Sequence, residues 1–211
     1  MNLNKGVIIN NRKLAHWGPM LDNWHNLIEQ YCNRVKEDTP YWYGETTNSA
    51  LLSTACFMAG GVSVVEAARP KGRGKDQWAG RGDLYLKWKN SSEEVEAKFC
   101  WYSFRSPNNI LSVAKEWSEY AIEDAKNLDR SYYSANFAIG ISFIAPDIKE
   151  DEKAGIDVFI EKAITTLKNS KNVFDVLAWC FPERMRRWVD TENKYLTPGI
   201  ILTGKIAASV Y

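Results

Sequence analysis

The sequence predicts an α/β protein in which a mixed central β-sheet is flanked by helices on both faces. Stretches with helical periodicity alternate with short apolar stretches that are typical of strands. A β-hairpin lies near the middle of the chain, and a helical stretch separates it from a nearly continuous apolar strand at 135–145. Such a helical crossover joins parallel strands through a right-handed connection. With 211 residues and no repeat or linker, we expect a single domain, 1–211.

Two helices are expected near the N-terminus, after a stretch at 1–19 that forms an arm or a short strand. An apolar stripe at helical spacing marks the first helix, at 20–36. Asp38-Thr39-Pro40 supplies an N-cap followed by proline at the first helical position, and the second helix runs from there to Met58. Glu45 lies near the start of this helix, where a carboxylate complements the helix dipole.

Three strands in a meander should follow. The stretch 62–68 is short and rich in valine, and 69–75 reads as a glycine-spaced basic loop. The central hairpin spans 79–101, with a turn at 89–92. Apolar and charged residues alternate along both hairpin arms, so each arm has one face for packing and one face with carboxylates and lysines.

The remaining elements complete the sheet and cover it. Ser106-Pro107 opens a third helix, whose apolar stripe reaches Leu128. The strand at 135–145 is apolar enough to be buried on both faces. A fourth helix is expected at 153–167, followed by strands at 173–181 and 199–207.

Composition excludes several classes of protein. A formal net charge of +1 gives no global attraction to polyanions, so any basic surface must be local. The four cysteines are widely spaced, which indicates reduced core thiols rather than a zinc or disulfide framework. No stretch resembles a signal peptide or a membrane span, and a cytoplasmic protein without membrane contact is expected.

The charged face of the hairpin carries the candidate chemistry. Asp83 lies on the first arm, and Glu96 and Lys98 lie on the second. Two carboxylates can hold a hard divalent cation through oxygen, and an ammonium two residues along a strand points into the same space. The ordinary alternative is a solvated face on which opposite charges pair across strands.

Residues and element order together resemble the restriction-endonuclease-like nucleases, the PD-(D/E)xK superfamily. The core of that family is a helix, a three-stranded meander, a helix and a further strand (αβββαβ). Asp83, the pair Glu96 and Lys98, and Glu45 occupy the positions of the family's motif residues. The similarity covers about 40–145, and leaves an extra N-terminal helix and a C-terminal αββ addition. Gly82 replaces the motif proline, and the Gln-x-x-x-Tyr of the RecB-like branch is absent.

The resemblance implies a metal-dependent endonuclease that hydrolyses phosphodiester bonds, with DNA a better candidate than RNA and a homodimer as one possible assembly. Asp83 and Glu96 would hold Mg²⁺, with Mn²⁺ as a substitute, and Lys98 would orient or deprotonate a water molecule. Glu45 would reach the metal through water or bind a second ion; alternatively it is a simple helix-start acid. Glu66 is a further possible ligand or a surface residue.

Two groups of basic residues are candidates for contact with nucleic-acid phosphates. The first group lies beside Asp83 and contains Lys71, Arg73, Lys75 and Arg81. The second group contains Arg184, Arg186 and Arg187. A solvated loop is the competing interpretation for both groups.

Two other functions stay open at the level of sequence. The first is a non-catalytic nucleic-acid-binding or interaction protein on the same scaffold, because a fold does not determine a function. The second is an unrelated α/β protein in which the charges of the hairpin only face solvent.

Overall fold

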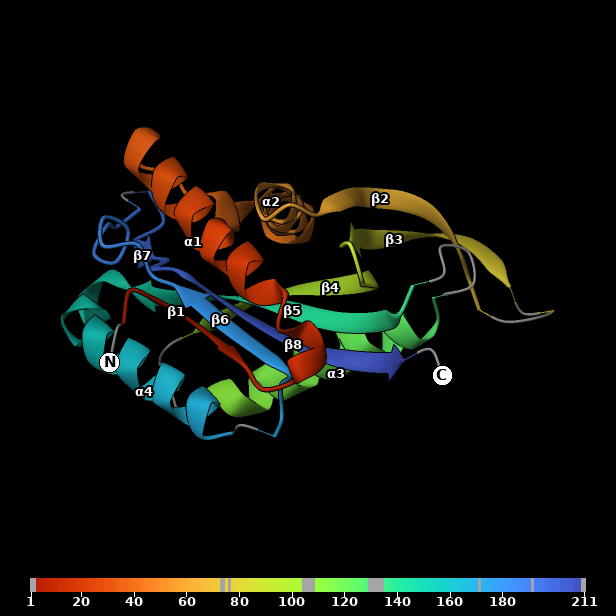
Figure 1. Cartoon of the computed structure of the whole chain (residues 1–211). Coiled ribbons are helices and arrows are strands. Elements are labelled where there is room, and N and C mark those ends of the chain that lie inside the picture. Colours follow the sequence, from red (N-terminus) through yellow and green to blue (C-terminus); the bar gives the residue numbers. More distant parts are fainter. Residues whose placement is uncertain are drawn as a thin grey trace.

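A computed structural model describes residues 3–72, 75, 77–103, 109–128, 135–170, 172–190 and 192–209. Across these residues the chain forms a mixed, mostly antiparallel eight-stranded sheet and four α-helices (Figure 1). The α/β class predicted from the sequence is therefore confirmed. None of the described helices is both long and apolar enough to cross a membrane.

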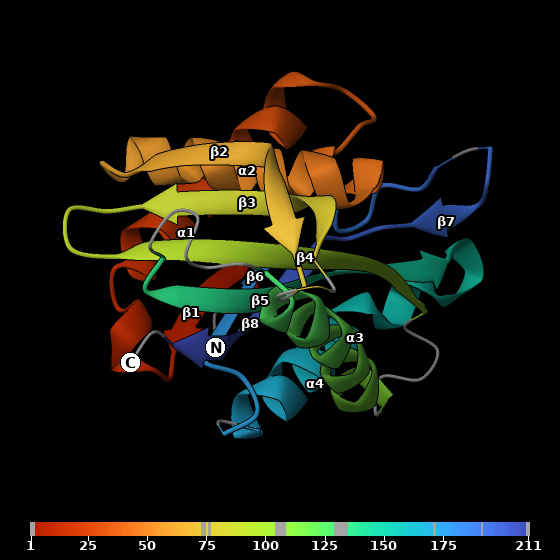
Figure 2. The ribbon, with the colours of Figure 1, turned by 90° about the vertical axis from the view of Figure 1, so that its right-hand side faces the viewer.

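The helices lie on both faces of the sheet (Figures 1 and 2). They are α1 (Trp17–Arg34), α2 (Gly44–Met58), α3 (Ile110–Lys126) and α4 (Ile156–Asn169). Residues of α1 and α2 pack with one side of the sheet in one apolar core, and residues of α3 and α4 pack in a second core. All four cysteines are buried and unpaired, as expected of core thiols.

The strand order is β1-β6-β8-β5-β4-β3-β2, and β7 pairs with β5. The strands are β1 (Lys5–Ile9), β2 (Val62–Lys71), β3 (Trp78–Lys87), β4 (Ser92–Ser103), β5 (Phe137–Lys149), β6 (Val176–Cys180), β7 (Tyr195–Leu196) and β8 (Ile200–Ser209). Strands β4 and β5 run parallel with α3 between them in sequence, as predicted. The short β7 was not expected from the sequence.

Several element boundaries differ from the sequence prediction. The helix expected from Pro40 is a 3-10 turn, Pro40–Tyr43, and α2 starts only at Gly44, whose φ of 75° interrupts the helix. The first residues of the expected fourth helix also form a 3-10 segment, Glu150–Gly155. The Ser106-Pro107 helix start lies outside the described residues.

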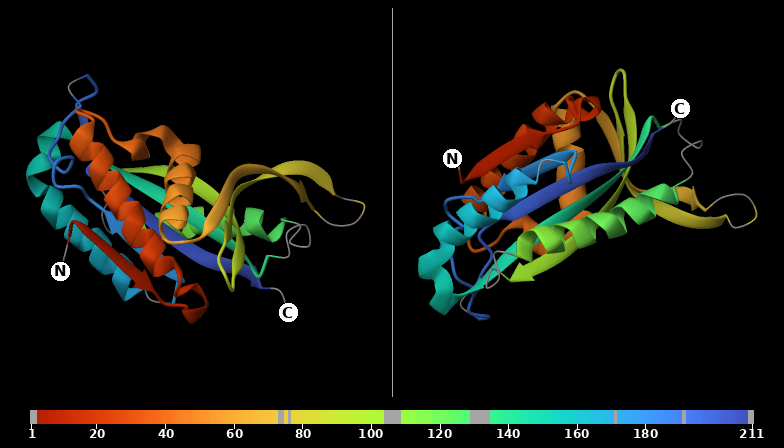
Figure 3. Two further views of the ribbon diagram at one scale, coloured as in Figure 1. Left: turned by 45° about the horizontal axis from the view of Figure 1, so that its top comes forward. Right: turned by 90° about the horizontal axis from the view of Figure 1, so that it is seen from below.

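The basic loop expected at 69–75 is largely strand. Residues 67–71 of β2 pair with 78–82 of β3, so β2 continues to Lys71. Strand β3 pairs with β4 only from Leu84 to Lys87, and residues 66–71 and 78–83 therefore form an arm that leaves the main sheet (Figure 3). The separation of β3 from β4 starts at Asp83.

Candidate active site

Asp83 lies where β3 separates from β4. Its Oδ2 accepts a hydrogen bond from the backbone N–H of Ala97 at 2.7 Å, in place of a ladder bond between the strands. This bond holds the Asp83 carboxylate against β4, beside Glu96. Glu96 is buried, with only 1% of its surface exposed.

Asp83 is close enough to both Glu96 and Glu45 to affect their ionisation. Burial and the neighbouring Asp83 charge raise the pKa of Glu96 to about 8. Burial and the Asp83 charge also raise the pKa of Glu45, at the start of α2, to about 7. The pKa of Asp83 itself is raised by burial. The structure thus brings Glu45 and Glu96 within electrostatic range of Asp83, and carboxyl groups with such raised pKa values are common at functional sites.

Lys98 joins this group through an acidic residue of α3. Its Nζ lies 2.5 Å from Oδ2 of Asp124, a residue that the sequence analysis had not singled out. Burial lowers the pKa of Lys98, but the hydrogen bond and charge of Asp124 outweigh it and leave the pKa raised. Lys98 is therefore held as a cation, and Asp124 fixes the position of its ammonium group.

Lys71 lies inside the site instead of on an open loop. Its Nζ is 3.0 Å from both carboxylate oxygens of Glu96, and it donates a hydrogen bond to Oε2. The expectation that Lys71 lies on a loop is wrong, because Lys71 is the last residue of β2, whereas its contact with nucleic-acid phosphates stays a prediction. The bend of the arm directs the lysine back over β4, where its charge partly offsets the buried carboxylates.

Glu66 contributes a fourth carboxylate and a strained backbone. It lies across from Asp83 on β2 and has a φ of 54°, which is unfavourable for a residue other than glycine. The charge of Glu66 raises the pKa of both Asp83 and Glu45. Arg81 lies 3.6 Å from Glu66, so this predicted phosphate contact is partly engaged by the carboxylate.

Gly82 makes room for a buried ion pair next to the site. Nε of Arg69 lies 3.0 and 3.1 Å from the two carboxylate oxygens of Glu94, and both residues are almost fully buried. A Cβ atom at Gly82 would lie 3.1 Å from Cγ of Arg69. The larger ring of a proline, the motif residue at this position, would therefore crowd the arginine.

The other predicted basic residues have varied environments. Lys75 is exposed, and Arg73 lies outside the described residues. The second basic group is engaged in structural contacts: Arg186 and Arg187 lie 3.2 and 2.8 Å from the Asp157 carboxylate of α4. Arg184 donates to the backbone oxygen of Asn33. The side chain of Arg187 nevertheless stays 72% exposed, and contact of this second basic group with nucleic acid stays a prediction.

The carboxylates have the chemistry of a site for a hard divalent cation, although their present arrangement is not a complete one. Oε1 of Glu96 is buried and lacks a hydrogen bond, and oxygen donors are the ligands that Mg²⁺ prefers. In the described part of the chain, no three His, Cys, Asp or Glu side chains are close enough to hold one ion as they stand. The positive charge next to Glu96 is the ammonium group of Lys71.

Sequence reasoning identified Asp83, Glu96, Lys98 and Glu45, but missed Asp124 and the inward position of Lys71. One feature of the sequence could have pointed to Asp124 as a site residue. It is a carboxylate in the helix that directly precedes β5, the strand that runs parallel to β4. No known family model matches this chain, and neither a curated protein nor a solved structure is detectably similar to it.

Proposed function

We propose that the protein is a metal-dependent nuclease of the restriction-endonuclease-like kind, with its active centre at Asp83, Glu96 and Lys98. The observation that carries the proposal is the group formed by the buried Glu96 and the half-buried Asp83 and Glu45, all with raised pKa values, near the point where β3 leaves β4. Keeping such groups together is costly for stability, and a bound cation would offset this cost.

The order of elements supports the same proposal. Helix α2, the meander β2–β3–β4, helix α3 and the parallel strand β5 follow one another as in the αβββαβ core. Asp83 is on the second strand of this meander, and Glu96 and Lys98 are on the third. The location of Glu45 in the first turn of the preceding helix also agrees with the resemblance.

In this proposal Asp83 and Glu96 would hold Mg²⁺, and Glu45, whose pKa responds to the charge of Asp83, would reach the ion through water or after a movement of its side chain. The bound ion supplies Lewis-acid activation of the phosphodiester and of a water molecule. Lys98 stays protonated through Asp124, so it orients the water by donating a hydrogen bond and offsets negative charge on the phosphate. Lys71 must leave Glu96 before both carboxylate oxygens become available.

A cleavage assay tests the proposal. Plasmid, linear and single-stranded DNA, and RNA, are incubated with the protein and Mg²⁺ or Mn²⁺, with EDTA as the negative control. Lys98→Ala should reduce cleavage roughly 10²–10⁴-fold while Mg²⁺ still raises the melting temperature. Asp124→Asn should cause a smaller loss, because it acts only by positioning Lys98.

Lys126→Ala is the matched control, since Lys126 also forms an ion pair on the α3 side of the sheet but pairs with the exposed Glu123. The Lys126→Ala variant should cleave nucleic acid at the same rate as the parent protein. Equal cleavage by the Lys98→Ala variant, or cleavage that is insensitive to EDTA, would contradict the assignment.

The second candidate is a non-catalytic nucleic-acid-binding or interaction protein. The Lys71–Glu96 ion pair favours this alternative, because it compensates the buried charge without any metal. Binding of nucleic acid without cleavage, at unchanged affinity in EDTA, would support it over the nuclease.

A further inference from the structure

A separate cavity of about 410 Å³ lies near Trp101, at the end of β4 opposite the turn that joins β4 to β3. Its volume is within the range of small-molecule sites. The described residues that line it are Trp42, Trp101, Asp147, Asp190, Asn193, Tyr195 and Thr197. Trp101 is five residues beyond Glu96, so strand alternation directs the two side chains to opposite faces of β4. The cavity is therefore distinct from the carboxylate centre.

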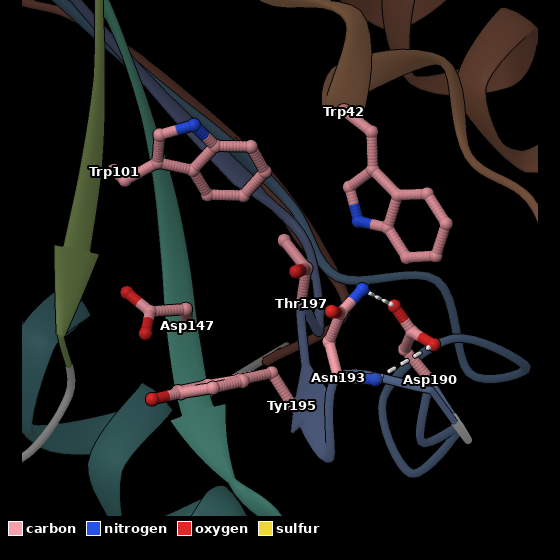
Figure 4. Close-up of a pocket in the computed structure, with 7 residues that line it drawn as sticks. All are labelled: Trp42, Trp101, Asp147, Asp190, Asn193, Tyr195 and Thr197. Carbon is pink, nitrogen blue, oxygen red and sulfur yellow. Dashed lines mark hydrogen bonds between the residues drawn. The ribbon is translucent and has the colours of Figure 1, made fainter.

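Three aromatic rings form walls of this cavity. Trp42 and Trp101 stand on opposite sides of it, and the ring of Tyr195 lies below them in Figure 4. A second aromatic residue supports each tryptophan from outside the cavity. The ring centroids of Trp42 and Trp188 are 5.3 Å apart, and those of Phe99 and Trp101 are also 5.3 Å apart. Such packing holds the walls in place before any ligand enters.

The rest of the wall supplies negative charge. Asp147 on β5 lies on the same face of the sheet as Trp101 on β4. Ala145 pairs with Trp101 in the parallel register, and Asp147 is two residues further along β5. Asp190 is kept ionised by hydrogen bonds from Asn193 and from the backbone of Glu192, which lower its pKa. No lysine or arginine is present among the described lining residues. The charge of the neighbouring Lys194 also helps to lower the pKa of Asp190, and the charged side chains that line the cavity itself in the described chain are those of Asp147 and Asp190.

We propose that this cavity, hereafter the aromatic cavity, binds an alkylated ammonium group. Aromatic faces attract a cation whose charge is spread over methyl groups, and a nearby carboxylate adds long-range attraction. Three rings with two aspartates provide both features, whereas a neutral apolar ligand would gain nothing from Asp147 or Asp190. The cation is either a free small molecule or a methylated lysine of a partner protein. This inference does not depend on the proposed nuclease function.

Isothermal titration calorimetry with choline tests the proposal, and its neutral isostere 3,3-dimethyl-1-butanol is the control ligand. Choline should bind, and the isostere should bind at least about tenfold more weakly. Trp101→Leu should weaken choline binding by roughly tenfold, and Asp147→Asn should weaken it several-fold. Trp78→Leu is the matched control variant: Trp78 is 51% exposed and Trp101 is 52% exposed, but Trp78 is outside the aromatic cavity.

A second arm of the experiment identifies the source of the cation. A short peptide with trimethyl-lysine is compared with choline and with the same peptide carrying unmodified lysine. Tighter binding of the methylated peptide assigns a protein partner, and tighter binding of choline assigns a small molecule. Equal binding of choline and its isostere, no detectable choline binding, or equal affinities in the Trp101→Leu and Trp78→Leu variants would overturn the proposal. Circular dichroism confirms that each variant is folded.

Discussion

Replacing Glu96 by glutamine should change the way in which the stability of the protein depends on pH. Burial and Asp83 raise the pKa of Glu96 from 4.5 to about 8 in the folded protein. Below pH 4.5 the carboxyl is neutral in both the folded and the unfolded chain. Between pH 4.5 and 8 the unfolded chain releases the proton while the folded protein retains it. The stability present below pH 4.5 is therefore lost progressively as pH rises through 8.

The difference between the pKa of 4.5 and the pKa of about 8 sets the size of the loss in stability. At about 1.4 kcal/mol for each pH unit, ionisation of Glu96 in the folded protein costs about 5 kcal/mol relative to the unfolded chain. Glutamine has nearly the same shape and no charge at any pH. The attraction of Lys71 for the ionised carboxylate is lost in the variant, but this attraction lowers the pKa of Glu96 and is already contained in the value of about 8.

Urea unfolding of the parent protein and of Glu96→Gln, at several pH values between 5 and 9, measures the effect. The free energy of unfolding of the variant, relative to the parent, should rise by several kcal/mol across this range. Glu119→Gln, at an exposed position on α3, should give a curve parallel to that of the parent. Parallel curves for Glu96→Gln and the parent would refute the reasoning, because they would show that Glu96 ionises as freely as in the unfolded chain.

Three further predictions concern the fold itself. Arg69→Met should lower the free energy of unfolding by about 3–5 kcal/mol because it leaves the buried Glu94 charge unpaired, and Arg69→Met/Glu94→Met should recover most of this loss in urea titrations. Burial lowers the pKa of His25 from 6.5 to about 4, so the unfolded chain takes up a proton first as pH falls. The parent should thus lose up to about 3 kcal/mol relative to His25→Gln between pH 6.5 and 4, and equal pH profiles would contradict this. Gly140→Ala should lower the melting temperature strongly, by the equivalent of about 3 kcal/mol or more, because the added Cβ would lie 2.4 Å from the backbone nitrogen of Ile122; a near-neutral result would mean that α3 packs further from the sheet.

Local patterns in the sequence were sufficient for most of the secondary structure. Alternation with a period of two defined the arms of the central hairpin, and helical periodicity defined α1, α3 and α4 within a few residues. The parallel pairing of β4 with β5 followed from the helix between them. Boundaries set by a single backbone angle, such as the break at Gly44, could not be read from periodicity.

The sequence predicted those residues of the candidate site that lie on the two paired strands of the central hairpin. Alternation along β4 directs Glu96 and Lys98 to the same side, and a hairpin partner brings Asp83 close to them. The sequence alone could not show that Lys71 contacts Glu96, because the two residues are on β2 and β4, which do not pair with each other in the sheet.

Only the tertiary structure determined the contacts between distant segments. Asp124 reaches Lys98 because α3 crosses the sheet directly against β4, which no local pattern encodes. The aromatic cavity joins side chains from the turn before α2, from β4, β5 and β7, and from the loop before β7. Each of these residues reads as an ordinary surface or core residue in its own segment. They become a site only because folding of the whole chain brings segments that are far apart in sequence to the same end of the sheet.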